Sequence, residues 1–196
     1  MPRKKSVKLA AQTFVAGAQA IEAFLQETSG LKAESRYWCT EFAIIRLYQE
    51  FEALILSAIV GAINNDTTTL SQSVGLNFPK HLSQDVCTFL IFKGGYFDFK
   101  GRDGLIEILK DFVPDNHYLP LIIRDQKYKP ALEKLSAFRN FAAHPRSQKA
   151  KKAAVRAIGG GNLGSAGGWL SRQGRFKNIS DSLVALAHEI EAKAPY

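Results

Sequence analysis

Residues 129–145 read KPALEKLSAFRNFAAHP, and this stretch decides the expected fold. Pro130 suits the first turn of a helix, because the N–H that it lacks would have no helical partner there. Apolar residues then follow at the spacing of one buried helix face, at Leu132, Leu135, Phe138 and Ala142. Pro145 disfavours helical geometry at the residue before it, so the helix should end or kink at His144. We therefore expect His144 to be exposed at a joint between two helices.

This helix also carries a permanent cation, an amide and a titratable imidazole, at Arg139, Asn140 and His144. Asn140 and His144 are four residues apart and share a face, whereas Arg139 lies about 140° around a regular helix from His144. The long Arg139 side chain or the kink must close that gap. Such groups suit metal-free cleavage of RNA, with His144 as base or acid and Arg139 stabilising the phosphorane. Asn140 would hold the imidazole or the phosphate, or join the helix to a neighbour.

The phrase Arg-Asn-x-x-Ala-His resembles a motif of the HEPN superfamily, small all-helical domains whose ribonuclease members carry Arg-polar-x(3 to 5)-His on a late helix. Chance gives fewer than roughly 0.1 such matches in a chain of this composition. The resemblance implies an all-α, HEPN-like helical bundle with Arg139, Asn140 and His144 as catalytic residues and no cofactor or metal. It also implies a homodimer whose two motifs face each other across a cleft. A dimer would meet a mechanistic need, since one protomer offers a single motif histidine for the acid and the base.

The same resemblance implies a biological role as the toxin of a toxin–antitoxin pair or as an effector of antiviral defence. An antitoxin or another inhibitor protein would then be a partner. Two alternatives stay open. In one, Arg139 pairs with a carboxylate such as Glu50 or Glu52, His144 merely ends the helix, and the chain is an inactive module that binds RNA or a partner protein. In the other, the motif helix binds a nucleotidyltransferase that modifies the chain.

Charge is distributed unevenly along the chain. Residues 1–125 hold 13 Lys and Arg against 14 Asp and Glu, whereas residues 126–196 hold 13 against 4. A basic half attracts polyanions by releasing their counterions, and here it surrounds the motif. We therefore expect RNA as the partner. The predicted RNA-binding residues are Arg146, Lys149, Lys151, Lys152, Arg156, Arg172 and Arg175.

The remaining pattern indicates one helical domain over residues 1–196. Apolar residues at steps of three and four predict a helix over residues 6–28 and a long one over roughly 34–64, which would form an antiparallel hairpin. Residues 65–79 are polar and predict a loop. Shorter helices are expected around Leu82–Leu90, ending at Gly94-Gly95, and around Leu105–Phe112. The aromatic group Tyr96, Phe97 and Phe99 fits a strand or a packed loop, and Leu119–Ile123 fits a helical turn or a strand.

Near the end of the chain, Gly159–Gly168 predicts a glycine-rich flap that would lie over bound RNA. Ser180 resembles the N-cap of a last helix, with Ile179 packed outside it. The sequence has no run of 18 uncharged apolar residues, and its start does not resemble a signal peptide. We expect a soluble, cytoplasmic protein with no membrane contact. Cys39 and Cys87 lack zinc-site spacing and are expected to be reduced thiols.

Overall fold

The computed structural model describes residues 6–64, 66–92, 95 and 97–195. All regular structure in this part of the chain is helical, so the all-α prediction is confirmed. The helices are α1 (Val7–Glu27), η1 (Thr28–Gly30), α2 (Ala33–Ile63), α3 (Thr68–Val74), α4 (Gln84–Phe92), α5 (Gly101–Lys110), α6 (Tyr118–Arg124), α7 (Lys129–Ala143), α8 (Gln148–Ala157), α9 (Ala166–Leu170) and α10 (Arg175–Lys193).

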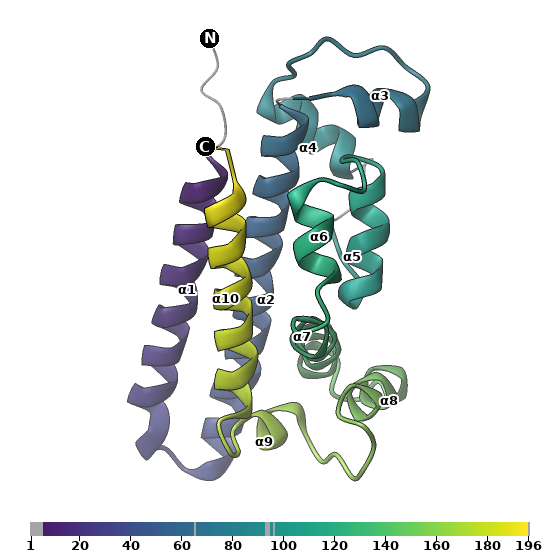
Figure 1. Ribbon diagram of the computed structural model, residues 1–196. Coiled ribbons are helices and arrows are strands. Elements are labelled where there is room, and N and C mark those ends of the chain that lie inside the picture. The colour runs from purple at the N-terminus through teal and green to yellow at the C-terminus, as the bar shows by residue number, and fades with distance from the viewer. Residues whose placement is uncertain (1–5, 65, 93–94, 96, 196) are drawn as a thin grey trace.

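Three long helices form one side of the bundle. Helices α1 and α2 make the predicted antiparallel hairpin, joined through η1, and α10 packs against α1 (Figure 1). The predicted stripe of α1 is buried, with Phe14 and Ala18 at most 1% exposed. Ser6 caps this helix by accepting a hydrogen bond from the Leu9 N–H. The apolar period therefore located both long helices of the hairpin.

The motif helix α7 packs across this layer. It contacts α2 and α10 on one side and α5 and α8 on others, and in Figure 1 it is seen end-on while α2 runs upright. Leu132, Leu135 and Phe138 are fully buried, as the stripe predicted. The helix begins at Lys129, with Pro130 in its first turn, and it ends at Ala143. Both ends of α7 were therefore predicted correctly.

The middle of the chain is more helical than its composition suggests. Residues 68–74 form α3 inside the predicted loop, because Leu70 is buried and Gly75 ends the helix in the left-handed conformation at φ +69°. The ambiguous segment Leu119–Ile123 is helical and belongs to α6. Of the aromatic group, Phe97 and Phe99 lie in a packed loop, whereas Tyr96 and the predicted stop at Gly94 lie outside the described residues.

The last helix begins six residues before the predicted start, since its N-cap is Gly174 and not Ser180. Gly174 adopts φ +65°, and α10 starts immediately after it at Arg175. Ser180 is not an N-cap: it is fully buried within α10, and its hydroxyl donates to Glu22 Oε1 at 2.7 Å. The expectation was wrong because Ser180 satisfies its hydroxyl through α1 and not through its own helix end. No helix in the described part of the chain is long and apolar enough to cross a membrane.

Candidate active site

The Arg139 side chain lies between α7 and α2. Its guanidinium carbon is 4.6 Å from the centroid of the Tyr48 ring, which is a cation–π distance. One guanidinium N–H group, Nη1, donates to Asn140 Oδ1 at 2.7 Å. The residue is half-buried. Two contacts thus fix the position of the motif cation before any ligand binds.

Tyr48 is the platform beneath that cation. Its side chain is buried, its ring stacks on Phe99 with centroids 4.8 Å apart, and its hydroxyl donates to Asp98 Oδ1 at 2.6 Å. The hydroxyl oxygen also lies 3.0 Å from the Phe99 carbonyl oxygen. Burial, the Asp98 hydrogen bond and the Glu52 charge raise the pKa of Tyr48 far above its usual range. The tyrosine therefore stays neutral and serves as a fixed hydrogen-bond donor.

Glu52 follows Tyr48 by one helical turn on α2 and interacts electrostatically with Arg139. Burial is the main cause that raises the pKa of Glu52 to about 7, and the Asp98 charge adds to it, while Arg139 and the Tyr48 hydroxyl act in the opposite direction. The Glu52 carboxyl group therefore holds its proton to a higher pH than an exposed glutamate does. Of the two carboxylates proposed as neighbours of the motif, Glu52 is the one that interacts. Glu50 instead forms an ion pair with Arg46 at 2.5 Å.

His144 is the C-cap of α7, with φ −132° and ψ 65°, and it is exposed as predicted. Its backbone is held at both ends, because its N–H donates to the Asn140 carbonyl at 3.0 Å and its carbonyl accepts from the Ser147 N–H at 2.9 Å. Within the described part of the chain, its imidazole makes no hydrogen bond or ion pair. The backbone at the joint is therefore ordered by local bonds, and the imidazole remains accessible to a ligand.

Asn140 makes a contact that the sequence did not predict. Its amide oxygen accepts a hydrogen bond from Arg139 and does not hold the imidazole. The reason is that the Arg139 side chain folds back over its neighbour while it stacks on Tyr48. No hydrogen bond joins Arg139 to His144 in the described part of the chain, so the two side chains stay apart across the gap of about 140° around the helix.

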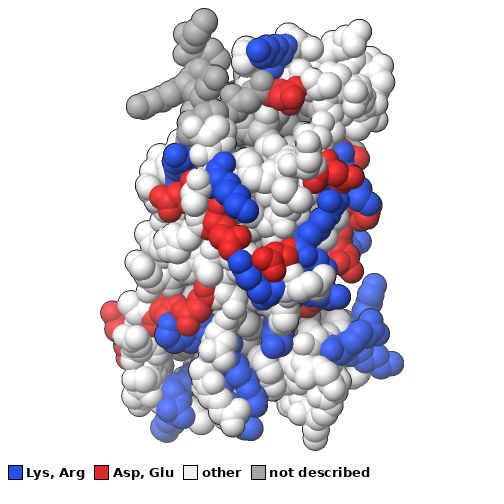
Figure 2. Space-filling model, viewed as in Figure 1, with Lys and Arg blue, Asp and Glu red and all other residues white. Residues whose placement is uncertain are grey.

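The basic surface continues from the joint into α8. Ser147 caps this helix by accepting from the Ala150 N–H, and Lys149, Lys152 and Arg156 share its exposed face. Blue side chains stand over α8 in Figure 2 with few acidic neighbours. Arg146 is exposed in the turn before the helix. Glu133, the only acidic residue between Lys127 and Lys177, is turned toward α5, where its carboxylate accepts from the Arg102 N–H.

Two of the predicted RNA-binding residues are placed differently. Lys151 lies about 200° around α8 from Lys149, so it points away from the shared face and is half-buried. Arg175 is held by its own segment, because its guanidinium stacks over Trp169 at 4.6 Å and donates to the Trp169 carbonyl and to Gln173. Arg172, in contrast, is exposed. Of the two predicted RNA-binding residues beyond α8, Arg172 is therefore the more accessible one.

The glycine-rich segment is a flap only in its first half. Gly159, Gly160 and Gly161 have positive φ angles and open space around them, as a loop requires. Gly167 and Gly168, however, are buried in α9 against α2, where the Gly167 N–H donates to Glu41 Oε1 at 2.9 Å. The expectation of a flap over the whole segment was wrong, because small residues here permit close helix packing. Leu163, in the same loop, is 2% exposed, so its side chain anchors the loop in the core.

Sequence reasoning missed Tyr48 and Asp98, which lie 50 residues apart and meet only in the folded chain. Cys39 and Cys87 are free thiols. Within the described residues, no group of three or more His, Cys, Asp or Glu side chains is arranged to hold a metal ion. Comparisons with protein-family models, with curated proteins and with solved structures found no match to this chain.

Proposed function

We propose that the chain is a metal-independent endoribonuclease of the HEPN type. The observation that carries this proposal is the arrangement of α7, which ends in an exposed imidazole at His144 and holds a guanidinium at Arg139 on the Tyr48 platform. The basic face of α8 follows directly and would attract the RNA backbone. The motif that resembles HEPN ribonucleases thus lies where a polyanion can reach it.

The chemistry would proceed by attack of the ribose 2′-oxygen on the adjacent phosphorus. The imidazole of His144 takes the 2′-OH proton as the new P–O bond forms, and Arg139 stabilises the charge on the phosphorane. The P–O5′ bond then breaks, and the leaving 5′-oxygen takes a proton from an acid. The products are a 2′,3′-cyclic phosphate and a 5′-OH end.

A homodimer would supply the second histidine as the acid. Exposed aromatic residues on α2 support self-association, because Trp38 is 58% exposed and Phe42 is 68% exposed. Phe42 lines a groove with Ile21 and Phe24 of α1, so this apolar strip on α2 continues onto the other helix of the hairpin. We expect two chains to meet on this apolar surface.

The biological role that we propose, a toxin of a toxin–antitoxin pair or an effector of antiviral defence, rests on the resemblance of the motif alone. Under that role, an antitoxin or inhibitor protein would cover the site in the cell. The basic face of α8 and the exposed strip on α2 are the two surfaces that such a protein would compete for.

The test is cleavage of a labelled single-stranded RNA in EDTA by the wild-type protein and by Arg139→Ala and His144→Ala. Both variants should lose cleavage, and circular dichroism should show that both remain folded. His188→Ala is the matched control, since His188 is also exposed but lies on α10 beside Glu191. Full activity in either motif variant, or equal loss in the control, would refute the assignment.

A second function is favoured by one specific observation: Arg139 is already engaged by Tyr48, Asn140 and the Glu52 charge. A non-catalytic module that binds RNA or a partner protein through α8 needs no free guanidinium. This alternative predicts salt-sensitive RNA binding without cleavage. It also predicts that His144→Ala leaves binding unchanged while loss of Lys149 and Lys152 weakens it.

A further inference from the structure

A cavity of about 480 Å³ lies between the end of the α1–α2 hairpin and the start of α10, away from the His144 joint. Its volume is within the range of small-molecule sites, roughly 300–1,000 Å³. Its walls come from α1, α2 and the segment that joins α9 to α10. None of its lining residues belongs to the motif.

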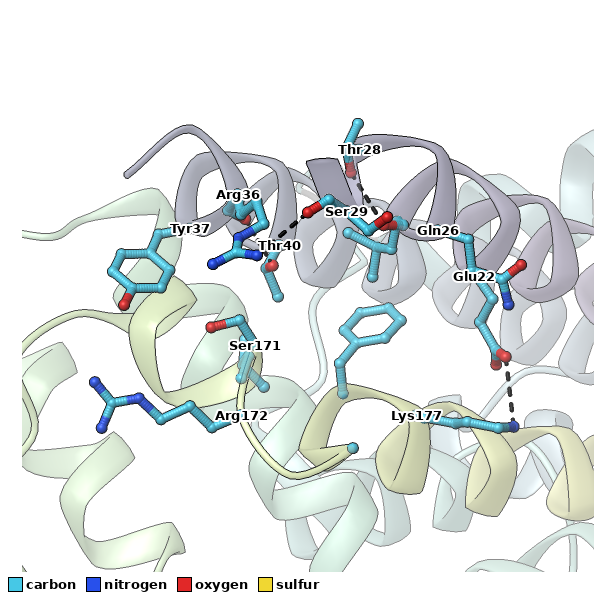
Figure 3. Close-up of a pocket in the computed structure, with 14 residues that line it drawn as sticks. Glu22, Gln26, Thr28, Ser29, Arg36, Tyr37, Thr40, Ser171, Arg172 and Lys177 are labelled. Atoms are coloured by element: carbon cyan, nitrogen blue, oxygen red, sulfur yellow. Dashed lines mark hydrogen bonds and ion pairs between the residues drawn. The ribbon is translucent and has the colours of Figure 1, made fainter. Parts of the chain in front are cut away.

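One end of this cavity is cationic. Figure 3 shows Arg36, Tyr37, Ser171 and Arg172 gathered there. The Arg36 guanidinium donates to a neutral acceptor, the Ser29 carbonyl, at 3.2 Å. The Arg172 side chain is exposed and, within the described part of the chain, has no carboxylate partner. Two guanidinium groups without a carboxylate counter-charge, beside two hydroxyl groups, suit a phosphate.

The cavity also has an apolar lining, and its far end is polar. The apolar lining comes from Leu25, Leu170 and Phe176. At the far end, Glu22 accepts from Ser180 and pairs with Lys177 at 3.5 Å, and Gln26 is adjacent. Lys177 is also paired with Asp181 at 2.6 Å, so its charge is balanced and the net positive charge remains at the Arg172 end.

The cavity thus has a cationic end, an apolar lining and a far end with hydrogen-bonding groups. From this arrangement, we propose that the cavity binds a nucleoside monophosphate. The phosphate lies between Arg36 and Arg172, and the base lies on the apolar lining against Phe176. The base edge then faces Glu22 and Gln26. The Glu22 carboxylate can accept from an exocyclic amine, and the Gln26 amide N–H can donate to a ring nitrogen. The same chemistry is offered by a free nucleotide and by a phosphorylated nucleotide at the end of a strand. The site does not depend on the proposed cleavage reaction.

The test is isothermal titration of the full chain with adenosine 5′-monophosphate, with adenosine and inorganic phosphate as separate probes. Saturable binding of the monophosphate is expected, at least tenfold tighter than either probe alone, because both ends of the cavity then contribute. Arg172→Gln should weaken monophosphate binding about tenfold or more through loss of a charge-assisted hydrogen bond. Lys8→Gln removes one exposed charge from α1, outside the cavity lining, and should leave monophosphate binding unchanged.

Competition with a short 5′-phosphorylated DNA strand identifies the source of the ligand. If the DNA strand displaces bound adenosine monophosphate at a lower concentration than free adenosine monophosphate needs for its own binding, the site is assigned to a strand end. If the strand does not displace it, the site is assigned to a free nucleotide. The proposal is overturned if the monophosphate does not bind saturably, if inorganic phosphate binds equally well, or if Arg172→Gln binds like the wild type. These readouts need no RNA cleavage, so an inactive His144→Ala protein should give the same titration as the wild type.

Discussion

Gly167→Ala tests the packing that positions α9 between the two candidate sites. A Cβ at this position would lie 2.1 Å from the Tyr37 carbonyl oxygen and 2.6 Å from its carbon. Ordinary contacts are above about 3.4 Å. Because both partners are backbone atoms of helices, the clash cannot be relieved by a side-chain rotation. The Cβ-to-oxygen distance of 2.1 Å must rise to about 3.4 Å, so either α9 or the start of α2 must move by more than 1 Å.

Overpacking of this kind costs about 1–3 kcal/mol. Displacement of α9 also lengthens the charge-assisted hydrogen bond from the Gly167 N–H to Glu41, which has a net value of about 1.5–3 kcal/mol. We take about 2–5 kcal/mol as the sum, since part of the hydrogen bond survives a small shift. For a chain of this length, each kcal/mol lowers Tm by about 2–4 °C. The expected loss in Tm is therefore about 4–20 °C.

The assay is thermal unfolding followed by circular dichroism, with Gly164→Ala as the matched control. Gly164 lies three residues earlier in the same segment, and a Cβ there meets nothing within 4 Å. The control should unfold within about 2 °C of the wild type. A Gly167→Ala protein as stable as the control would contradict the close approach of α9 to α2.

Three further results are expected. Glu52 has a pKa of about 7 in the folded chain against 4.5 unfolded, so its contribution to stability is fully present below pH 4.5 and is lost as pH rises through 7. After allowance for partial exposure this amounts to about 1–2 kcal/mol, and urea unfolding of Glu52→Gln should lack that decline. Ser180→Ala should destabilise by about 1–2 kcal/mol in the same assay, because Glu22 loses a buried donor; unchanged stability would contradict the bond. Replacing Lys149 and Lys152 by Gln should reduce the salt slope of single-stranded RNA binding by about 1.4, or about 0.7 for each phosphate that is no longer neutralised, and an unchanged slope would remove α8 from the interface.

Elements with a repeated apolar period were predictable from sequence. Helices α1, α2 and α7 bury the stripes that the spacing of three and four residues marks, and Pro145 ends α7 as its chemistry requires. Helix α3 was missed because its seven residues carry one buried apolar side chain, Leu70, which is too little for a period to show.

Local signals failed where a distant residue satisfies a polar group. Ser180 has the letters of an N-cap, but its hydroxyl bonds to Glu22, which is 158 residues away in the chain. Gly167 belongs by composition to a loop, yet the backbone of α2 approaches it so closely that only glycine fits. Neither contact can be predicted from the residues next to it in the sequence.

Only the part of the candidate site that lies within one short stretch of sequence could be predicted. The order Arg139, Asn140, His144 and the exposure of the histidine follow from the motif and the proline. The Tyr48 platform and its bond to Asp98 depend on how α2 packs against α7 and the loop before α5. The bond from Arg139 to Asn140 accompanies that same packing, because the Arg139 guanidinium also stacks on Tyr48.

The most direct test of the proposed function compares three labelled strands of one sequence in EDTA with the wild-type protein. One strand is RNA, one is DNA, and one is DNA with a single ribonucleotide. We predict that RNA is cut to 2′,3′-cyclic phosphate ends, that the mixed strand is cut only on the 3′ side of its ribonucleotide, and that DNA stays intact, with all cutting lost in His144→Ala. Cleavage of the DNA strand, or intact RNA with a folded protein that still binds it, would contradict a mechanism that uses the 2′-OH and His144.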